Sequence, residues 1–184
     1  SNPQKPLLLV SGGKQGCHAL NLAIEECLIK LLPQWNIFHQ TGDNSKTDDF
    51  KRLTEKRESL PSNLKDSYIV ESYSKEFKRV MATADLIIGR SGAHTAYEVL
   101  LLGKRMIAIP LPFSYGQEQL RNAQLLVDNS LGTILPQNEL TSQRLVQLIK
   151  QELRHCSNKQ NRNTTAVVKN AAEVMTEDVV RMFS

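Results

Sequence analysis

Short apolar runs alternate with segments of helical period along the 184-residue chain, and this alternation limits the fold more than any other feature. A continuous apolar run of strand length that ends in turn residues is typical of a strand buried on both faces. Such runs predict strands at 6–10, 35–42, 67–73, 85–89, 105–112 and 132–136. The other segments predict helices at about 20–31, 74–84, 94–102, 117–129, 141–154 and 164–183, a polar, exposed helix or loop at 45–58, and a polar loop at 155–163. We therefore expect one domain over 1–184, α/β in class, with a Rossmann-like parallel sheet of about six strands and helices on both faces.

Composition and charge argue against several classes of function. The hydrophobic fraction of 40% and the charged fraction of 23% are ordinary for a globular protein, and the net charge of +4 comes from basic residues scattered among acidic ones. We therefore expect no nucleic-acid partner and only a modest attraction to an anionic membrane surface. No apolar run approaches the length of about 20 residues that a membrane span needs, and nothing resembles a signal peptide.

The cysteines and histidines give no sign of a metal site. Cys17, Cys27 and Cys156 have neither metal-ligand spacing nor the even number of a disulfide framework, which favours a reducing compartment. The four histidines lack ligand spacing as well, so we expect no metal. The abrupt passage from "SNPQKP" into the first strand suggests a piece of a longer protein.

Two glycine-containing turns follow predicted strands and precede predicted helices. The first, "SGGKQG" at 11–16, lets the backbone approach a ligand, and the free amides of the following helix suit an anion, to which Lys14 adds positive charge. The second, "RSGAHTAYE" at 90–98, has the same arrangement, so two helix N-termini are expected to face one anion such as a diphosphate. The alternative for the first turn is a tight connection without a ligand.

The second turn also carries two side chains with other expected roles. Glu98 lies one helical turn past Thr95, and a carboxylate there suits paired ribose hydroxyls rather than a phosphate. The alternative is that Glu98 caps the helix or forms a surface ion pair. A general-base role for His94 is disfavoured, because no carboxylate nearby in sequence orients the ring.

Two further polar clusters stand at strand ends. In "HQTG" at 39–42, His39 is expected to be structural, whereas the amide of Gln40 can both donate to and accept from a ligand. In "PLPFSYGQEQLRNA" at 110–123, polar residues gather at a helix start and resemble a set of readers of sugar hydroxyls, with helix capping as the alternative. These residues are Gln117, Glu118, Gln119 and Asn122.

Taken together, the segments "LLLVSGGKQGCHALN", "WNIFHQTG", "ADLIIGRSGAHTAYE", "GKRMIAIPLP" and "QLRNAQLL" resemble the MurG-type glycosyltransferases of glycosyltransferase family 28 in order and spacing. The resemblance extends over nearly the whole chain but only over the C-terminal half of such an enzyme. It implies a GT-B architecture in which this half binds UDP-N-acetylglucosamine, and in which the acceptor-binding N-terminal domain is absent from this sequence. It further implies an inverting, metal-independent hexosyltransferase without cofactors. Such an enzyme works in the cytoplasm, peripheral on the inner face of the cell membrane, and uses a lipid-linked acceptor of peptidoglycan synthesis.

The resemblance also assigns roles by position, although the catalytic residues are expected on the missing domain. The diphosphate is expected on the glycine loop and on the second turn, and the uracil on the backbone at Ser74. Glu98 is expected to bind the ribose, Gln40 to line the donor pocket, and Glu118, Gln119 and Asn122 to surround the sugar. The complete predicted set is Gly13, Lys14, Gln15, Gly16, Gln40, Ser74, Arg90, Ser91, Gly92, Ala93, Thr95, Glu98, Glu118, Gln119 and Asn122.

Two departures from the family pattern leave alternatives open. Lys14 stands where the family usually has serine, and Glu118 stands near a position that is often glutamine or histidine. "GQEQLRNA" is also similar to the diacylglycerol galactosyltransferases of the same superfamily. The alternatives are therefore a diacylglycerol glycosyltransferase domain, a UDP-sugar-binding subunit of a split transferase, and a UDP-sugar hydrolase. The fragment alone is expected to bind the donor without turnover.

Overall fold

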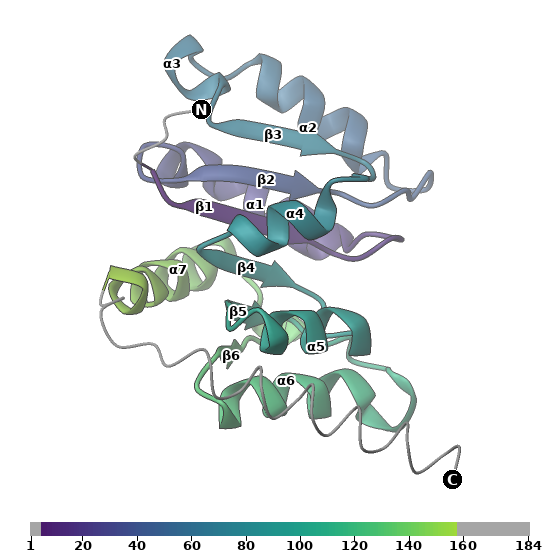
Figure 1. Ribbon diagram of the computed structural model, residues 1–184. Helices are drawn as coiled ribbons and strands as arrows, with labels where there is room; N and C mark the ends of the chain where they lie inside the picture. The colour runs from purple at the N-terminus through teal and green to yellow at the C-terminus, as the bar shows by residue number, and fades with distance from the viewer. Residues whose placement is uncertain (1–4, 158–184) are drawn as a thin grey trace, which may run out of the picture.

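A six-stranded parallel sheet forms the centre of the molecule, which is described by a computed structural model over residues 5–157 (Figure 1). The strand order is β3-β2-β1-β4-β5-β6, and every neighbouring pair is parallel. The strands are β1 (Leu7–Ser11), β2 (Asn36–Gln40), β3 (Tyr68–Glu71), β4 (Leu86–Gly89), β5 (Arg105–Ala108) and β6 (Gly132–Ile134). The Rossmann-like fold expected from the alternating pattern is confirmed.

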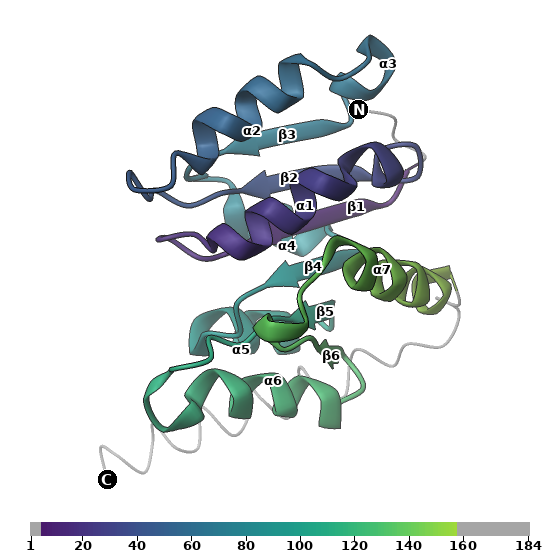
Figure 2. The same ribbon diagram turned by 180° about the vertical axis from the view of Figure 1, so that it is seen from behind.

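Helices cover both faces of the sheet, as the views from the two sides show (Figures 1 and 2). They are α1 (His18–Leu31), α2 (Asp49–Glu58), α3 (Ser62–Lys65), α4 (Phe77–Thr83), α5 (Ala93–Leu101), α6 (Glu118–Asp128) and α7 (Ser142–Ser157), with short 3-10 turns at Tyr115–Gln117 and Gln137–Glu139. α1 and α7 pack on one face, where Leu8, Val10 and Ile88 belong to the core. α4, α5 and α6 pack on the other face, against Leu9, Ile87 and Met106. Alternate residues of each strand therefore enter opposite cores, which is why these strands read as continuous apolar runs.

Several expected boundaries were wrong. The strand predicted at 35–42 ends at Gln40, and the one predicted at 105–112 ends at Ala108, before the prolines that cannot donate to a ladder. The segment 45–58 contains α2, which is not wholly exposed because Asp49 and Leu53 are buried. α7 continues to Ser157, so the predicted loop at 155–163 begins inside a helix. The helix predicted at 164–183 lies outside the described residues.

Candidate functional site

The carboxyl ends of the strands line up in one row of residues. The register pairs Ser11 of β1 with Gln40 of β2 on one side and with Gly89 of β4 on the other. β1 is followed by α1 on one face of the sheet and β4 by α5 on the opposite face. The boundary between β1 and β4 is therefore the point at which the strand order reverses, and open parallel sheets bind ligands there.

The glycine loop (residues 12–16) connects β1 to α1 in a conformation that requires glycine. Gly13 and Gly16 have φ values of 85° and 77°, in the left-handed region that side chains rarely adopt. The Gly13 amide donates to Ser11 Oγ at 3.1 Å, and the Gly16 amide donates to the Gly13 carbonyl at 3.1 Å. The loop thus turns back on itself and leaves Lys14 exposed at its tip.

The turn between β4 and α5 is fixed from the side of α6. Ser91 is fully buried, and its hydroxyl donates to the Gln119 carbonyl at 2.7 Å. The Asn122 amide donates back to the Ser91 carbonyl at 3.0 Å. These bonds hold the turn in place, and α5 begins directly after Gly92, so the first amides of α5 lack partners within the helix.

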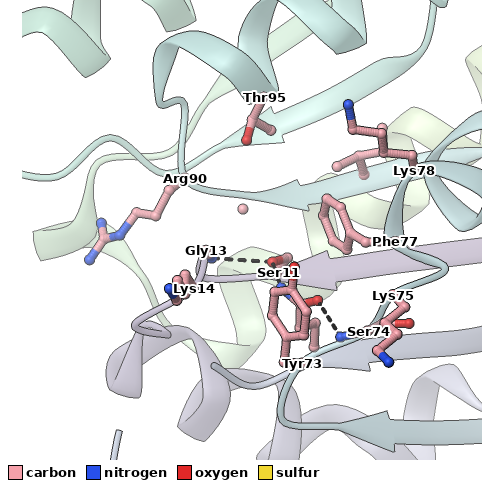
Figure 3. Close-up of a pocket in the computed structure, with 13 residues that line it drawn as sticks. Ser11, Gly13, Lys14, Tyr73, Ser74, Lys75, Phe77, Lys78, Arg90 and Thr95 are labelled. Atoms are coloured by element: carbon pink, nitrogen blue, oxygen red, sulfur yellow. Dashed lines mark hydrogen bonds between the residues drawn. The ribbon is translucent and has the colours of Figure 1, made fainter. Parts of the chain in front are cut away.

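A cavity of about 310 Å³ lies between these two connections (Figure 3). Gly13 and Lys14 line it from the glycine loop, and Arg90 and Thr95 line it from the second turn. The floor is the row of strand ends. The complete lining is Ser11, Gly13, Lys14, Gln40, Tyr73, Ser74, Lys75, Phe77, Lys78, Ile87, Gly89, Arg90 and Thr95. The cavity is thus lined by a glycine loop, the start of a helix, three lysines and two aromatic rings.

Gln40 joins three of the elements around the cavity. Its side-chain oxygen accepts a hydrogen bond from the Ser74 amide at 3.0 Å, and its nitrogen donates to Ser11 Oγ at 3.4 Å (Figure 3). The segment after β3 is thereby held against the end of β1, and it places Tyr73 and Phe77 beside the cavity. These two rings offer flat apolar surface, of the kind that stacks on a nucleobase.

The structure places six of the predicted residues on the cavity. They are Gly13, Lys14, Gln40, Ser74, Arg90 and Thr95. Arg90 contributes its stem more than its charge, because its guanidinium donates to the carbonyls of Ile109 and Pro110 and to Gln137 Oε1. Figure 3 shows this side chain extending away from the other lining residues.

The other predicted residues stand behind or beside the cavity. Gly16 faces away from it, towards residues 41–42, while Ser91, Gln119 and Asn122 belong to the bonds that fix the second turn. The remaining members do not contribute to its lining; these are Gln15, Gly92, Ala93, Glu98 and Glu118.

The side chains of Glu98 and His94 have different surroundings. The Glu98 carboxylate forms an ion pair with Lys78 Nζ at 3.1 Å, and Lys78 lines the cavity. Glu98 itself lines a neighbouring groove that also includes Lys78. His94 is exposed at the start of α5 and does not contribute to the lining.

Sequence reasoning missed the contribution of the segment after β3, apart from Ser74. Tyr73, Lys75, Phe77 and Lys78 all line the cavity. The signal was available, because these residues follow a predicted strand in the same way as the two glycine turns do. Because open parallel sheets bind ligands at the carboxyl ends of their strands, the two aromatic rings and two lysines could have been added to the candidate site.

Behind the glycine loop, a buried hydrogen-bond network connects β3, β2, α1 and α2. Tyr68 Oη lies 3.0 Å from His39 Nδ1, and His39 Nε2 lies 2.9 Å from Asn21 Oδ1. Burial lowers the pKa of His39 to about 3, so the ring is neutral, and it raises the pKa of Tyr68. The expectation that His39 is structural is confirmed, since the ring has no exposed surface.

Two kinds of feature are absent from residues 5–157. No group of three or more His, Cys, Asp or Glu side chains in that range is arranged to hold a metal ion. No helix among the same residues is both long and apolar enough to span a membrane.

The chain is similar to known glycosyltransferases over most of its length. Residues 7–179 match the family model described as the glycosyltransferase family 28 C-terminal domain. The UDP-N-acetylglucosamine–N-acetylmuramyl-(pentapeptide) pyrophosphoryl-undecaprenol N-acetylglucosamine transferase of Syntrophus aciditrophicus is 33% identical over 82% of this chain and 40% of its own length. The enzyme of the same name from Pelobacter propionicus is 35% identical over 78% of this chain and 37% of its own length. The chain therefore spans about 40% of the curated relatives that it matches.

Solved structures give the same result. The crystal structure of MurG from Acinetobacter baumannii matches 92% of this chain and 46% of its own, with a TM-score of 0.71 and 29% identity. The solution structure of ALG13 matches 79% of this chain and 84% of its own at 16% identity and a TM-score of 0.51, which shows a likeness of fold alone. The sheet and helices thus correspond to one half of a GT-B glycosyltransferase. Since the family model extends over nearly all the described residues and beyond, the chain belongs to glycosyltransferase family 28, as its C-terminal domain.

Proposed function

We propose that this domain binds the UDP-sugar donor, UDP-N-acetylglucosamine, of an inverting hexosyltransferase. The observation that carries the proposal is the cavity at the reversal of strand order, lined by the glycine loop on one side and by the start of α5 on the other. The relatives named above transfer N-acetylglucosamine, which supports the choice of sugar.

The diphosphate fits best between the two connections. Amides at the N-terminus of a helix and in a glycine turn donate to phosphate oxygens, and the helix dipole favours negative charge there. Lys14 adds a full positive charge at the tip of the glycine loop, and Lys75 and Lys78 line the opposite part of the cavity. As the sugar leaves, negative charge grows on the UDP, and donors already in place stabilise it without reorganisation. The domain thus contributes to the reaction by stabilising the leaving group.

The nucleoside and the sugar have separate candidate partners. We assign the uracil to the wall made by Ser74 with Tyr73 and Phe77, and the ribose hydroxyls to Glu98, which must exchange its Lys78 partner for them. The sugar is assigned to the α6 side, where Gln119 and Glu118 begin the helix and Asn122 follows one turn later. In the present arrangement the Gln119 side chain accepts from the Leu111 amide at 3.0 Å, so its nitrogen remains the group available to a sugar hydroxyl.

The names of the relatives support a proposal for the acceptor and for the location of the enzyme. Their names specify a lipid-linked muramyl-pentapeptide acceptor, and we propose the same class for the protein to which this domain belongs. The acceptor site and the catalytic base are assigned to the part of the relatives that this chain does not span. We propose that the enzyme works as a peripheral protein at the inner face of the cell membrane, since a lipid-linked acceptor resides in a membrane.

Calorimetric titration with UDP, UDP-N-acetylglucosamine and GDP tests the donor assignment. We expect UDP and UDP-N-acetylglucosamine to bind with micromolar to millimolar dissociation constants. We expect GDP to bind at least about tenfold more weakly, because the larger guanine base does not fit the wall of Tyr73, Ser74 and Phe77 that is assigned to uracil. Failure of both uridine nucleotides to bind at millimolar concentration would overturn the proposal. Equal binding of GDP would leave an anion site without donor specificity.

A further inference from the structure

The glycine loop is held from behind by residues 41–43. A Cβ atom on Gly16 would lie 2.2 Å from the Thr41 carbonyl oxygen, and one on Gly42 would lie 2.1 Å from the Gly16 nitrogen. The two segments therefore touch through bare backbone. The Asp43 amide also donates to the Lys14 carbonyl at 2.9 Å. The position of the loop that lines the cavity thus depends on where residues 41–43 stand.

The side chain of Asn21 helps to fix that position, together with the hydrogen bonds that the Thr41 and Gly42 amides donate to the Glu71 and Ser72 carbonyls. Its Nδ2 donates to the Thr41 carbonyl at 3.1 Å, the same oxygen that limits Gly16. Asn21 lies in the first turn of α1 and is fully buried. It does not line the cavity, so any influence on a ligand passes through the Thr41 carbonyl and the loop.

The surroundings of Asn21 permit a single orientation of its amide. Two acceptors, the Thr41 carbonyl and Asp49 Oδ2 at 2.9 Å, face Nδ2. On the opposite side Oδ1 faces Nε2 of the neutral His39 ring at 2.9 Å, so Nε2 carries the ring proton and Nδ1 accepts from the Tyr68 hydroxyl. A flipped amide would place Oδ1 against the Thr41 carbonyl and the Asp49 carboxylate, neither of which can donate to it. The network therefore keeps Nδ2 of Asn21 directed towards the Thr41 carbonyl.

Asp49 supplies the charge that keeps this orientation. Burial opposes its ionisation, but hydrogen bonds from Asn21, His18, Arg52 and Thr47 outweigh that cost and hold its pKa below the usual range. His18 Nδ1 lies 2.8 Å away and the Arg52 guanidinium 2.7 Å away. An ionised carboxylate has no proton to donate, so it accepts from Asn21 in one direction only.

We propose that Asn21 and Asp49 are positioning residues of the diphosphate subsite. They hold the glycine loop in the shape that presents its amides and Lys14 to the phosphates, although neither touches the ligand. The inference rests on the proposed function of the cavity. It adds that the affinity of the cavity for phosphate depends on the Asp49 carboxylate, which lies behind the glycine loop.

Two near-isosteric variants test the proposal, Asn21→Asp and Asp49→Asn. The first replaces the donor to Thr41 with an oxygen, and the second removes the charge that aims the amide. Glu152→Gln is the matched control: Glu152 is as buried as Asp49, at 4% exposed, and accepts from Arg105 of β5 and Thr133 of β6, at the other end of the strand order. Urea unfolding of all three establishes that each variant is folded under the conditions used.

The first readout needs no ligand. The amides of Gly16 and Asp43 donate to the carbonyls of Gly13 and Lys14, and their hydrogen exchange is measured by NMR. We expect this exchange to speed up by at least about fivefold in both network variants and to stay unchanged in Glu152→Gln. Exchange that rises equally in the control, or that does not rise in either network variant, would overturn the positioning role. This outcome is independent of whether the cavity binds UDP.

The second readout separates the two ends of the ligand. Both network variants are expected to weaken inorganic pyrophosphate and UDP by at least about fivefold while uridine binding changes less than about twofold. A general loss of structure would weaken all three probes together and contradict the proposal. If the unmodified chain binds neither UDP nor pyrophosphate, the proposed function fails, while the exchange readout still decides the positioning role.

Discussion

The carbonyl oxygen of Thr41 lies where a Cβ atom on Gly16 would have to stand, at 2.2 Å from the ideal position of that atom. The contact joins the loop after β1 to the loop after β2 at the edge of the sheet where the cavity opens. The two backbones approach this closely only because Gly16 and Gly42, the residue after Thr41, have no side chains. The glycines of the sequence motifs "SGGKQG" and "HQTG" therefore allow the two loops to pack against each other.

Substitution of Gly16 with alanine is predicted to destabilise the domain. The new methyl group would meet the Thr41 carbonyl, and φ at this residue is 77°, so steric overlap and backbone strain add together. We expect a loss of roughly 1–3 kcal/mol in the free energy of unfolding. Urea unfolding measures it, with Gly92→Ala as the control, because a Cβ at Gly92 meets nothing within 4 Å. Equal stability of the two variants would show that the two loops separate readily.

Substitution of Lys14 with serine is predicted to weaken UDP binding and to reduce its dependence on salt. The ammonium group is exposed, so its attraction to phosphate is screened by ions. We expect a loss of about three- to tenfold at low ionic strength and a smaller loss at high salt. Lys30→Ser, at the C-terminal end of α1, is the matched control and is expected to change neither quantity. A loss that stays constant with salt would mean that Lys14 acts through loop shape rather than charge.

Substitution of Glu98 with alanine is predicted to weaken UDP far more than pyrophosphate. A carboxylate that accepts two ribose hydroxyls contributes only to ligands that contain ribose. We expect about a tenfold loss for UDP and less than about a twofold change for pyrophosphate, measured by calorimetry. Glu55→Ala, at an exposed position of α2, is the control. Equal losses for both ligands would exclude the ribose role and leave the ion pair with Lys78 as the function of this side chain.

The stability of the domain is predicted to fall as the pH drops from 7 to 5. The pKa of His39 is about 3 in the folded state, whereas the pKa of a histidine in the unfolded state is near 6.5. At a pH between these values the unfolded state binds a proton and the folded state does not. The free energy of unfolding should decrease by about 2 kcal/mol from this residue over that interval. Chemical denaturation at several pH values measures the slope, and His39→Gln should flatten it. An unchanged slope in that variant would contradict the assignment of a neutral buried ring.

Much of the fold and part of the site could be predicted from the sequence. The strands were found because residues such as Leu8 and Leu9 enter opposite cores, which makes a parallel strand continuously apolar. The two glycine turns were found because a turn between a strand and a helix at the carboxyl edge has a characteristic composition. The predicted ends of helices and strands were less accurate. Thr41, for example, lies beyond the end of β2 and contacts Gly16, which no local sequence pattern indicates.

The rest depended on contacts between residues far apart in the chain. Nothing local to Arg90 indicates that its guanidinium binds the carbonyls of Ile109 and Pro110. Ser91 likewise has the composition of a phosphate contact, and yet its hydroxyl bonds to α6. Asp49 was assigned to an exposed segment because its neighbours are polar, and its burial follows from the packing of α2 on α1.

The most direct test of the account is to locate UDP on the domain by NMR. In a titration of the labelled chain, we expect the largest amide shifts in the glycine loop at Gly13 and Lys14, and in the second turn from Arg90 to Thr95. Residues at the opposite edge of the sheet, such as Leu7 and Arg105, should remain unchanged. Shifts confined to any other surface, or to one of the two connections alone, would contradict a diphosphate held between the strand ends of β1 and β4.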